Sequence, residues 1–130
     1  MCDDGAGGCT LRAAIGEANA TGGADTITFD LGAGTPTITP LAALPDVTDP
    51  VSILGNTGGA TRVQLAGTSA GSDGLRLATG SSGSLVRALV INRFAGAGIR
   101  IGSADDVIEG CWIGLDATGG ATVAGNAGTG

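Results

Sequence analysis

Two arginines, Arg76 and Arg100, stand 24 residues apart, and each lies between two aliphatic residues. In such an apolar-polar-apolar triplet the apolar side chains face one side of a strand and the arginine faces the other. If the two strands are neighbours, the guanidinium groups lie about 5 Å apart and can bind a carboxylate or sulfate group of an acidic polysaccharide. The alternative is that Asp73, Asp105 and Asp106 on neighbouring turns neutralise both cations on a solvent-exposed face.

Two further pairs of charged residues stand out. Asp105 and Asp106 are adjacent, and paired carboxylates can act as general acid and base or bind Ca²⁺. Adjacent residues on a strand point to opposite faces, however, and Asp is favoured in a turn such as 102–106 because it bonds to the backbone. We therefore expect a turn role for both and no metal site. Arg87 and Glu109, 22 residues apart, are expected to form a structural ion pair across two repeats.

An apolar surface is predicted around the single tryptophan. Gln64, Val90 and Trp112 occupy the middle, outward position of three similar triplets, so Val90 and Trp112 are expected to be neighbours on the surface. Such a patch can stack on sugar rings or become buried in a contact between subunits. The alternative is that the loop 115–123 covers the tryptophan.

The residue types that are missing exclude several kinds of active site. The 130 residues contain no histidine and no lysine, which excludes a Ser-His-Asp triad, a histidine metal cluster and a P-loop. No cofactor is expected. Cys2 and Cys9 are close enough in sequence to close a small disulfide loop, which would suit an oxidising compartment; the alternative is two free thiols. Cys111 lies in an apolar run and is expected in the core.

Charge and hydropathy limit the partners. The net charge is −6, which opposes binding to polyanions, so nucleic acid is not an expected partner. No run approaches the roughly 18 consecutive apolar residues of a membrane-spanning helix, and no transmembrane segment is expected. Apolar residues make up 42% of the chain and are almost all small aliphatics. The length and this composition predict one domain with a thin interior.

A short amphipathic helix is predicted over residues 10–19. Thr10 can cap its first turn, and two consecutive glycines at 22–23 end it. Apolar residues recur at positions i, i+3, i+4 and i+7 of this segment, namely Leu11, Ala14, Ile15 and Ala18. A helix of about 10 residues is marginal alone in water. Its apolar stripe must therefore pack on the rest of the chain.

From residue 24 onward, short apolar strands alternate with turns and recur at regular spacing. One ladder has a period of 24 residues and comprises Ile27-Thr28-Phe29, Val51-Ser52-Ile53, Leu75-Arg76-Leu77 and Ile99-Arg100-Ile101. A second ladder comprises a strand near 37–41 and the triplets 63–65, 89–91 and 111–113. A third pairs 85–86 with 107–108. Strands that repeat every 22 to 26 residues are typical of a solenoid.

These ladders predict an all-β fold: a short parallel β-helix of about four coils with an N-terminal capping α-helix. Residues 1–23 would form a Cys loop and the capping helix, and residues 24–130 the coils, with an uncapped C-terminal end. Inward residues of the first ladder would stack in two columns, one starting at Ile27 and the other at Phe29. An antiparallel sandwich would show the same alternation but gives no reason for a fixed period.

The N-terminal segment resembles the CSLREAI domain, which precedes right-handed parallel β-helix repeats in bacterial surface proteins. The resemblance rests on Cys9-Thr10-Leu11-Arg12-Ala13-Ala14-Ile15, Glu17-Ala18-Asn19 and Asp25-Thr26-Ile27-Thr28-Phe29. One position departs from it, because Ala13 stands where the family usually has Glu. The segments 113–119 and 125–126 also resemble coil junctions of such proteins. Together with the usual chirality of parallel crossovers, the resemblance implies a right-handed β-helix that is secreted or displayed on a bacterial cell surface.

The expected function is that of a noncatalytic structural or adhesive module. An uncapped coil end invites association, so either the solenoid continues or the chain forms a homo-oligomer through that end or through the face of Val90 and Trp112. The alternative is a polysaccharide-acting lyase or hydrolase with catalytic candidates Arg76, Arg100, Asp73, Asp105 and Asp106. A small-molecule hydrolase ranks last, because no base other than a carboxylate could activate a serine.

Overall fold

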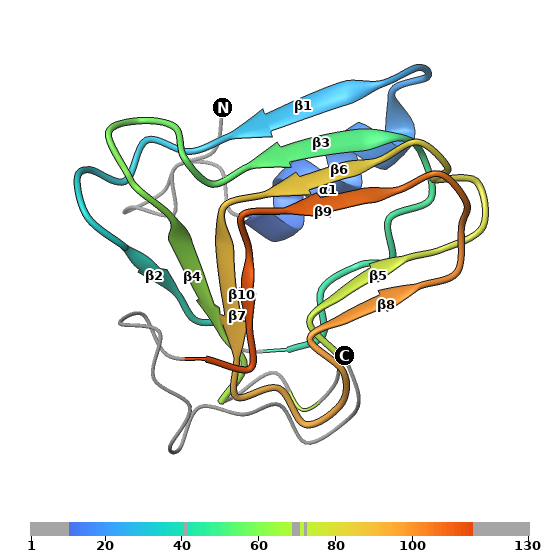
Figure 1. Cartoon of the computed structure of the whole chain (residues 1–130). Coiled ribbons are helices and arrows are strands. Elements are labelled where there is room, and N and C mark those ends of the chain that lie inside the picture. Colours follow the sequence, from blue (N-terminus) through green and yellow to red (C-terminus); the bar gives the residue numbers. More distant parts are fainter. Residues whose placement is uncertain (1–10, 41, 69–70, 72, 116–130) are drawn as a thin grey trace.

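The described residues form a β-solenoid with one helix at one end, as Figure 1 shows for the computed structural model. The structure describes residues 11–40, 42–68, 71 and 73–115. Helix α1 spans Leu11–Ala20. All strand pairs are parallel, which confirms the predicted parallel β-helix with an N-terminal cap.

The strands form three sheets that are the faces of the solenoid (Figure 1). The first sheet has the order β1-β3-β6-β9, the second β10-β7-β4-β2, and the third contains β5 and β8. The first sheet comprises β1 (Asp25–Thr28), β3 (Val51–Leu54), β6 (Leu85–Arg87) and β9 (Val107–Glu109). The second comprises β2 (Thr37–Ile38), β4 (Val63–Ala66), β7 (Leu89–Asn92) and β10 (Trp112–Ile113), and the third β5 (Leu75–Leu77) and β8 (Ile99–Ile101).

The second and third predicted ladders are confirmed by the register. Gln64 lies opposite Thr37 on one side and Val90 on the other, and Val90 lies opposite Trp112. In the first sheet, Leu85 lies opposite Val107, as the third ladder predicted. Inward and outward positions are therefore preserved from coil to coil along these strands.

The 24-residue ladder is only partly right. Its last two triplets do pair, with Leu75 opposite Ile99, but they form the third sheet. Its first two triplets belong to the first sheet, where Ile27 lies opposite Ile53 rather than Val51. The solenoid accordingly has about three turns and not about four. The reason is that the connections between strands differ in length, so equal spacing in the sequence does not mean equal position in the coil.

The core consists of aliphatic columns that run along the solenoid axis. Ile27, Ile53 and Val86 are buried and stack in register in the first sheet. Leu65 and Ile91 do the same in the second. Each coil therefore buries apolar side chains against the coil before it, which is the main stabilising contribution in such a repeat fold.

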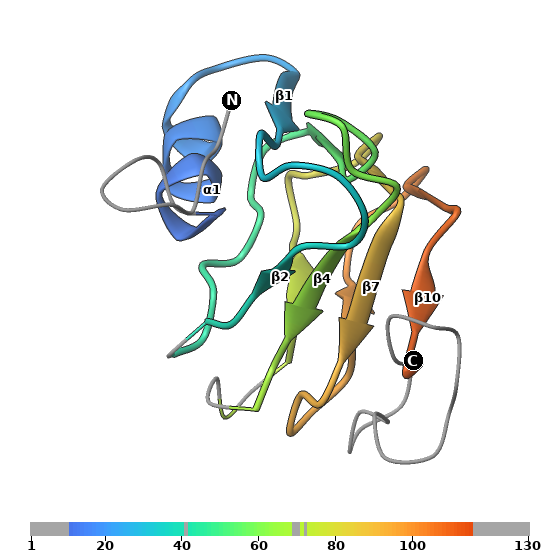
Figure 2. The ribbon, with the colours of Figure 1, turned by 90° about the vertical axis from the view of Figure 1, so that its left-hand side faces the viewer.

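Helix α1 covers the first coil. Leu11, Ile15 and Ala18 are buried in the core, and Figure 2 shows the helix beside β1 at the end of the solenoid where the chain begins. Asn19 fastens the helix to a loop: its Nδ2 donates to the carbonyl of Asp46 at 2.8 Å, and its Oδ1 accepts from the amide of Thr48 at 2.9 Å. The predicted cap at Thr10 lies outside the described residues.

Candidate functional site

Arg76 and Arg100 lie side by side on the outer face of the third sheet, as the triplets predicted. They are partners in the parallel register of β5 and β8, and both are exposed. The carboxylate of Asp73 forms an ion pair with each of them. Its Oδ2 accepts from Arg100 Nε at 2.7 Å and is 3.7 Å from Arg76 Nε. Asp46 adds a carboxylate 3.5 Å from Arg76 Nε.

Asp73 holds this cluster in a structural arrangement. Its Oδ1 accepts from the backbone amide of Ala97 at 2.7 Å and from Arg100 Nη2 at 3.3 Å. The hydrogen bond from Arg100, followed by that from Ala97, lowers the pKa of Asp73. A carboxylate with a lowered pKa is a weak base, so the cluster fits the predicted neutralisation of the arginines better than proton abstraction. A shallow hollow of about 200 Å³ lies beside Arg76 and Arg100.

Asp105 and Asp106 have the turn roles that the sequence indicated. Asp105 adopts a left-handed backbone with φ of 59° and is exposed. Asp106 accepts from the amide of Ser84 at 3.0 Å through Oδ1 and from the hydroxyl of Ser103 through Oδ2. The two carboxylates thus serve different purposes, since Asp106 joins its turn to that of the preceding coil.

The expected apolar surface around Val90 is not present. Gln64, Val90 and Trp112 do form one column, but Val90 is 0% exposed. Gln64 makes polar contacts along the same face: its Nε2 donates to Thr37 Oγ1 at 2.7 Å, and its Oε1 accepts from Asn92 Nδ2 at 2.9 Å. The prediction that Val90 is a surface contact residue is therefore wrong, because it treated an outward position as an exposed one.

Trp112 is half-buried, and one face of its ring is occupied. The guanidinium carbon of Arg62 lies 3.9 Å from the ring centroid, which is a cation–π contact. Arg62 is fixed further by a 3.0 Å hydrogen bond from Nε to the carbonyl of Gly110. The predicted covering of Trp112 by the loop 115–123 falls almost wholly outside the described residues.

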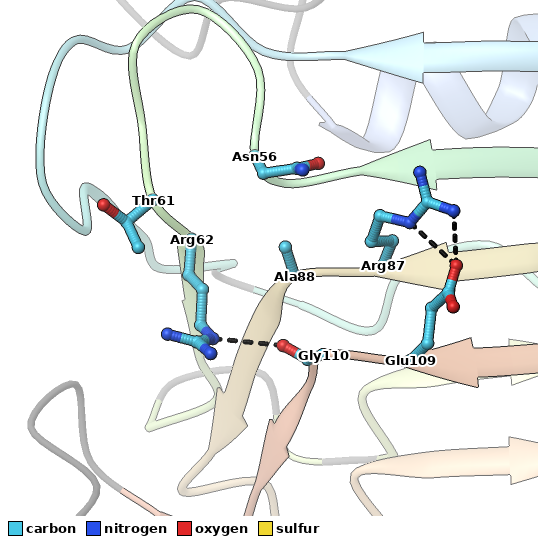
Figure 3. A pocket seen from close by; sticks show the side chains of 7 residues that line it. All are labelled: Asn56, Thr61, Arg62, Arg87, Ala88, Glu109 and Gly110. Atoms are coloured by element: carbon cyan, nitrogen blue, oxygen red, sulfur yellow. Dashed lines mark hydrogen bonds and ion pairs between the residues drawn. The ribbon is translucent and has the colours of Figure 1, made fainter.

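A pocket of about 330 Å³ lies at the corner between the first and second sheets (Figure 3). Its lining residues are Asn56, Thr61, Arg62, Arg87, Ala88, Glu109 and Gly110. In the later coils this corner is tight, because a single left-handed residue stands at the bend, Ala88 with φ of 59° and Gly110 with φ of 62°. In the coil before them the longer segment 55–62 joins β3 to β4 and forms a wall.

Arg87 and Glu109 line the other side of this pocket and form the ion pair that the sequence predicted. Arg87 Nε donates to Glu109 Oε1 at 2.8 Å, and Nη2 donates to the same oxygen. Figure 3 shows the pair on one side of Ala88 and Arg62 on the other. Sequence reasoning missed Arg62 as a site residue, because it lies at the end of a connecting loop and takes part in no repeat.

Of the three cysteines, Cys111 alone lies among the described residues. It is partly buried against the core, as predicted, and its thiol donates weakly to the carbonyl of Glu109 at 3.4 Å. Burial raises the pKa of the Cys111 thiol. Cys2 and Cys9, with the disulfide predicted between them, lie outside the described residues.

The described residues offer neither a metal-binding cluster nor a membrane-spanning helix. They contain no group of three or more His, Cys, Asp or Glu side chains placed to bind a metal ion. In the same part of the chain, no helix has the length and apolar character needed to cross a membrane.

No protein family, curated protein or solved structure matches this chain.

Proposed function

We propose that this chain is a noncatalytic structural or adhesive module of a secreted or cell-surface β-helix protein, and that it self-associates through the exposed end of the last coil that the structure describes. The location outside the cell rests on the resemblance of residues 9–29 to the CSLREAI segment. The self-association rests on the geometry of the last coil.

The observation that carries the proposal is the exposure of apolar side chains in that coil. Val47, Leu77 and Ile101 belong to one inward column of the solenoid. Leu77 is 1% exposed, whereas Ile101, one coil later, is 51% exposed. A side chain that is buried in one coil and open in the next indicates a surface that another β-coil would cover.

The other two sheets show the same gradient. Val86 is buried, and its partner Ile108 in the last strand is only partly buried. Ile91 is buried, and its partner Ile113 is only partly buried. Among the described strands, β8, β9 and β10 each pair on one side only, so their outer backbone groups can accept another strand.

The opposite end of the solenoid cannot serve in the same way. Helix α1 lies beside β1 at that end (Figure 2). Its residues Leu11, Ile15 and Ala18 are buried. Stacking of an open end on a capped end would leave the exposed strands without partners. Two copies would therefore meet with their exposed coil ends facing each other. Such a symmetric contact uses both exposed ends, so the assembly stops at a dimer.

The alternative, a polysaccharide-acting enzyme at Arg76 and Arg100, finds less support. Asp73 accepts hydrogen bonds from Arg100, forms an ion pair with Arg76 and has a lowered pKa. Asp106 bonds to Ser84 and Ser103. These contacts favour a structural role for the cluster.

Size-exclusion chromatography with light scattering over a range of protein concentrations tests the proposal. The wild-type chain is expected to dimerise, and Ile101→Asp is expected to weaken the dimer because a charge replaces an apolar contact. Thr26→Asp is the matched control: it introduces the same charge at an exposed position of β1, in the first coil. A wild-type chain that stays monomeric at the highest concentration, or equal effects of the two variants, would contradict the proposal.

A further inference from the structure

We infer that two copies of the chain meet with Arg100 of each opposite Glu109 of the other, so that β8 of one copy pairs with β9 of the second. The inference rests on the proposed self-association and specifies which strands and which charges form the contact. It follows from the symmetry of such a contact and from the side chains that the strands of the exposed coil end present.

Symmetry limits the contact to three arrangements. β8, β9 and β10 lie one in each sheet at the exposed coil end (Figure 1). A two-fold axis perpendicular to the solenoid axis reverses the direction in which the chain runs around the coil, so the facing strands are antiparallel. The same axis places one of the three strands opposite its own copy and exchanges the other two. Each arrangement is therefore defined by the strand that faces itself.

The outward side chains distinguish these arrangements. Arg100 is the exposed middle residue of β8, so β8 fully paired with itself would place two arginines opposite each other, which is destabilising. β9 fully paired with itself would place Glu109 opposite Val107 and give the carboxylate no cation from the second copy. Pairing of β10 with itself brings β8 against β9 and sets Arg100 against Glu109. Opposite charges then face each other at two symmetric positions.

The inward side chains fit the same register. When Arg100 lies opposite Glu109, antiparallel pairing places Ile101 opposite Ile108 of the second copy. Both isoleucines belong to inward columns, because their partners in the preceding coil are buried. Ile101 is 51% exposed and Ile108 is partly buried. One register therefore covers apolar side chains on the inside and pairs charges on the outside.

Both charged groups retain atoms for a partner. Asp73, in the preceding coil, engages Nε and Nη2 of Arg100. These nitrogens lie on one edge of the planar guanidinium, so Nη1 is turned away from that carboxylate. Arg87 donates to Oε1 of Glu109, and Oε2 accepts no hydrogen bond from the residues that the structure describes. A guanidinium nitrogen and a carboxylate oxygen are complementary groups for a charged hydrogen bond.

Dimer dissociation constants of the intact chain, measured by analytical ultracentrifugation, test the inference. Arg100→Gln and Glu109→Gln are each expected to weaken the dimer about tenfold, because a charged pair is lost at both symmetric positions. The double variant is expected to lose no more than either single variant, since the same pair is removed. Arg76→Gln is the matched control, because it removes the same charge and an ion pair to Asp73 one coil earlier. It is expected to dimerise like the wild type.

Disulfide formation identifies the register without depending on the strength of the ion pair. Directly opposite residues of antiparallel strands have Cα atoms about 4.5–5.5 Å apart, a distance that a disulfide can bridge. A mixture of Arg100→Cys and Glu109→Cys chains in oxidised glutathione is therefore expected to become linked between these two positions. Mass spectrometry of the peptides identifies the linked residues. Arg100→Cys chains alone are not expected to link to one another at residue 100.

The outcomes separate this inference from the proposal on which it rests. A chain that stays monomeric at all concentrations overturns both. A dimer that Ile101→Asp weakens, but that Arg100→Gln leaves at wild-type affinity, overturns the strand arrangement alone. Additive losses in the double variant, or a disulfide between two Arg100→Cys chains, would do the same, because the two residues would then not meet.

Discussion

The carboxylate of Asp73 accepts a 2.7 Å hydrogen bond from Nε of Arg100, which lies 27 residues later in the chain. The same carboxylate accepts from the amide of Ala97. It therefore joins the turn before β5 to the segment that leads into β8 in the next coil. A residue that the sequence suggested as a catalytic candidate is a link between two coils.

Replacement of Asp73 is expected to destabilise the chain in a pH-dependent way. Asp73→Ala removes bonds from Arg100 and Ala97, and we expect a loss of about 1–2 kcal/mol, limited by solvent screening of the exposed arginine. The pKa of Asp73 is lowered from 3.8, so its contribution is complete above that value and is lost as the pH falls through the lower folded-state pKa. Urea unfolding of wild type and variant should therefore differ at pH 7 and converge at strongly acidic pH. A constant difference would contradict this assignment.

The adjacent carboxylates Asp105 and Asp106 are expected to respond differently to substitution. Asp106→Ala leaves the amide of Ser84 and the hydroxyl of Ser103 without their acceptor, which should cost about 1–2 kcal/mol. Asp105→Asn keeps a residue type that tolerates the left-handed backbone and should change stability by less than about 0.5 kcal/mol. Thermal unfolding of the two variants compares them directly. Equal losses would show that the turn does not depend on the Asp106 side chain.

Two glycines should respond in opposite directions to alanine. Gly16 lies in the middle of α1 with nothing within 4 Å of an added Cβ, so Gly16→Ala should stabilise the chain by about 0.5–1 kcal/mol through helix propensity. At Gly55 an added Cβ would lie 2.1 Å from the carbonyl oxygen of Ala88. Gly55→Ala should therefore destabilise the chain by about 1–3 kcal/mol. Chemical denaturation midpoints check both signs.

The Cys111 thiol is expected to react slowly in the folded chain. Burial raises its pKa, and the thiolate is the reactive form. At neutral pH, alkylation mapped by mass spectrometry should therefore be slower at Cys111 in buffer than in denaturant. Equal rates in the two conditions would mean that the last coil opens freely.

The alternation of apolar and polar residues was enough to predict the strands and their parallel stacking, but not which sheet each strand joins. The triplets at Gln64, Val90 and Trp112 were placed correctly because the connections between them are similar. The triplets at 51–53 and 75–77 look equally alike, yet they lie in different sheets. Local alternation reports only that a strand has one buried side, and every face of the solenoid satisfies that condition.

The candidate sites divide in the same way. The pairing of Arg76 with Arg100 and of Arg87 with Glu109 followed from the sequence, because parallel neighbours in register bring outward residues together. The burial of Val90 did not, because alternation says which way a side chain points and not what covers it. The position of Arg62 did not either, because this residue stands at the end of the connecting loop 55–62. No repeat in the sequence marks that loop as the wall of a pocket.

By itself, the sequence determined a stack of short parallel strands with a helix at its beginning, since hydrophobic periodicity is encoded residue by residue. The tertiary structure alone decided which strands share a sheet, that the coils number about three, and that Arg62 meets Trp112 and lines a pocket with Arg87. The reason is physical. Periodicity fixes which way a side chain points, whereas contacts between coils depend on the length of each loop and the conformation of each corner, which set the positions of the strands that follow.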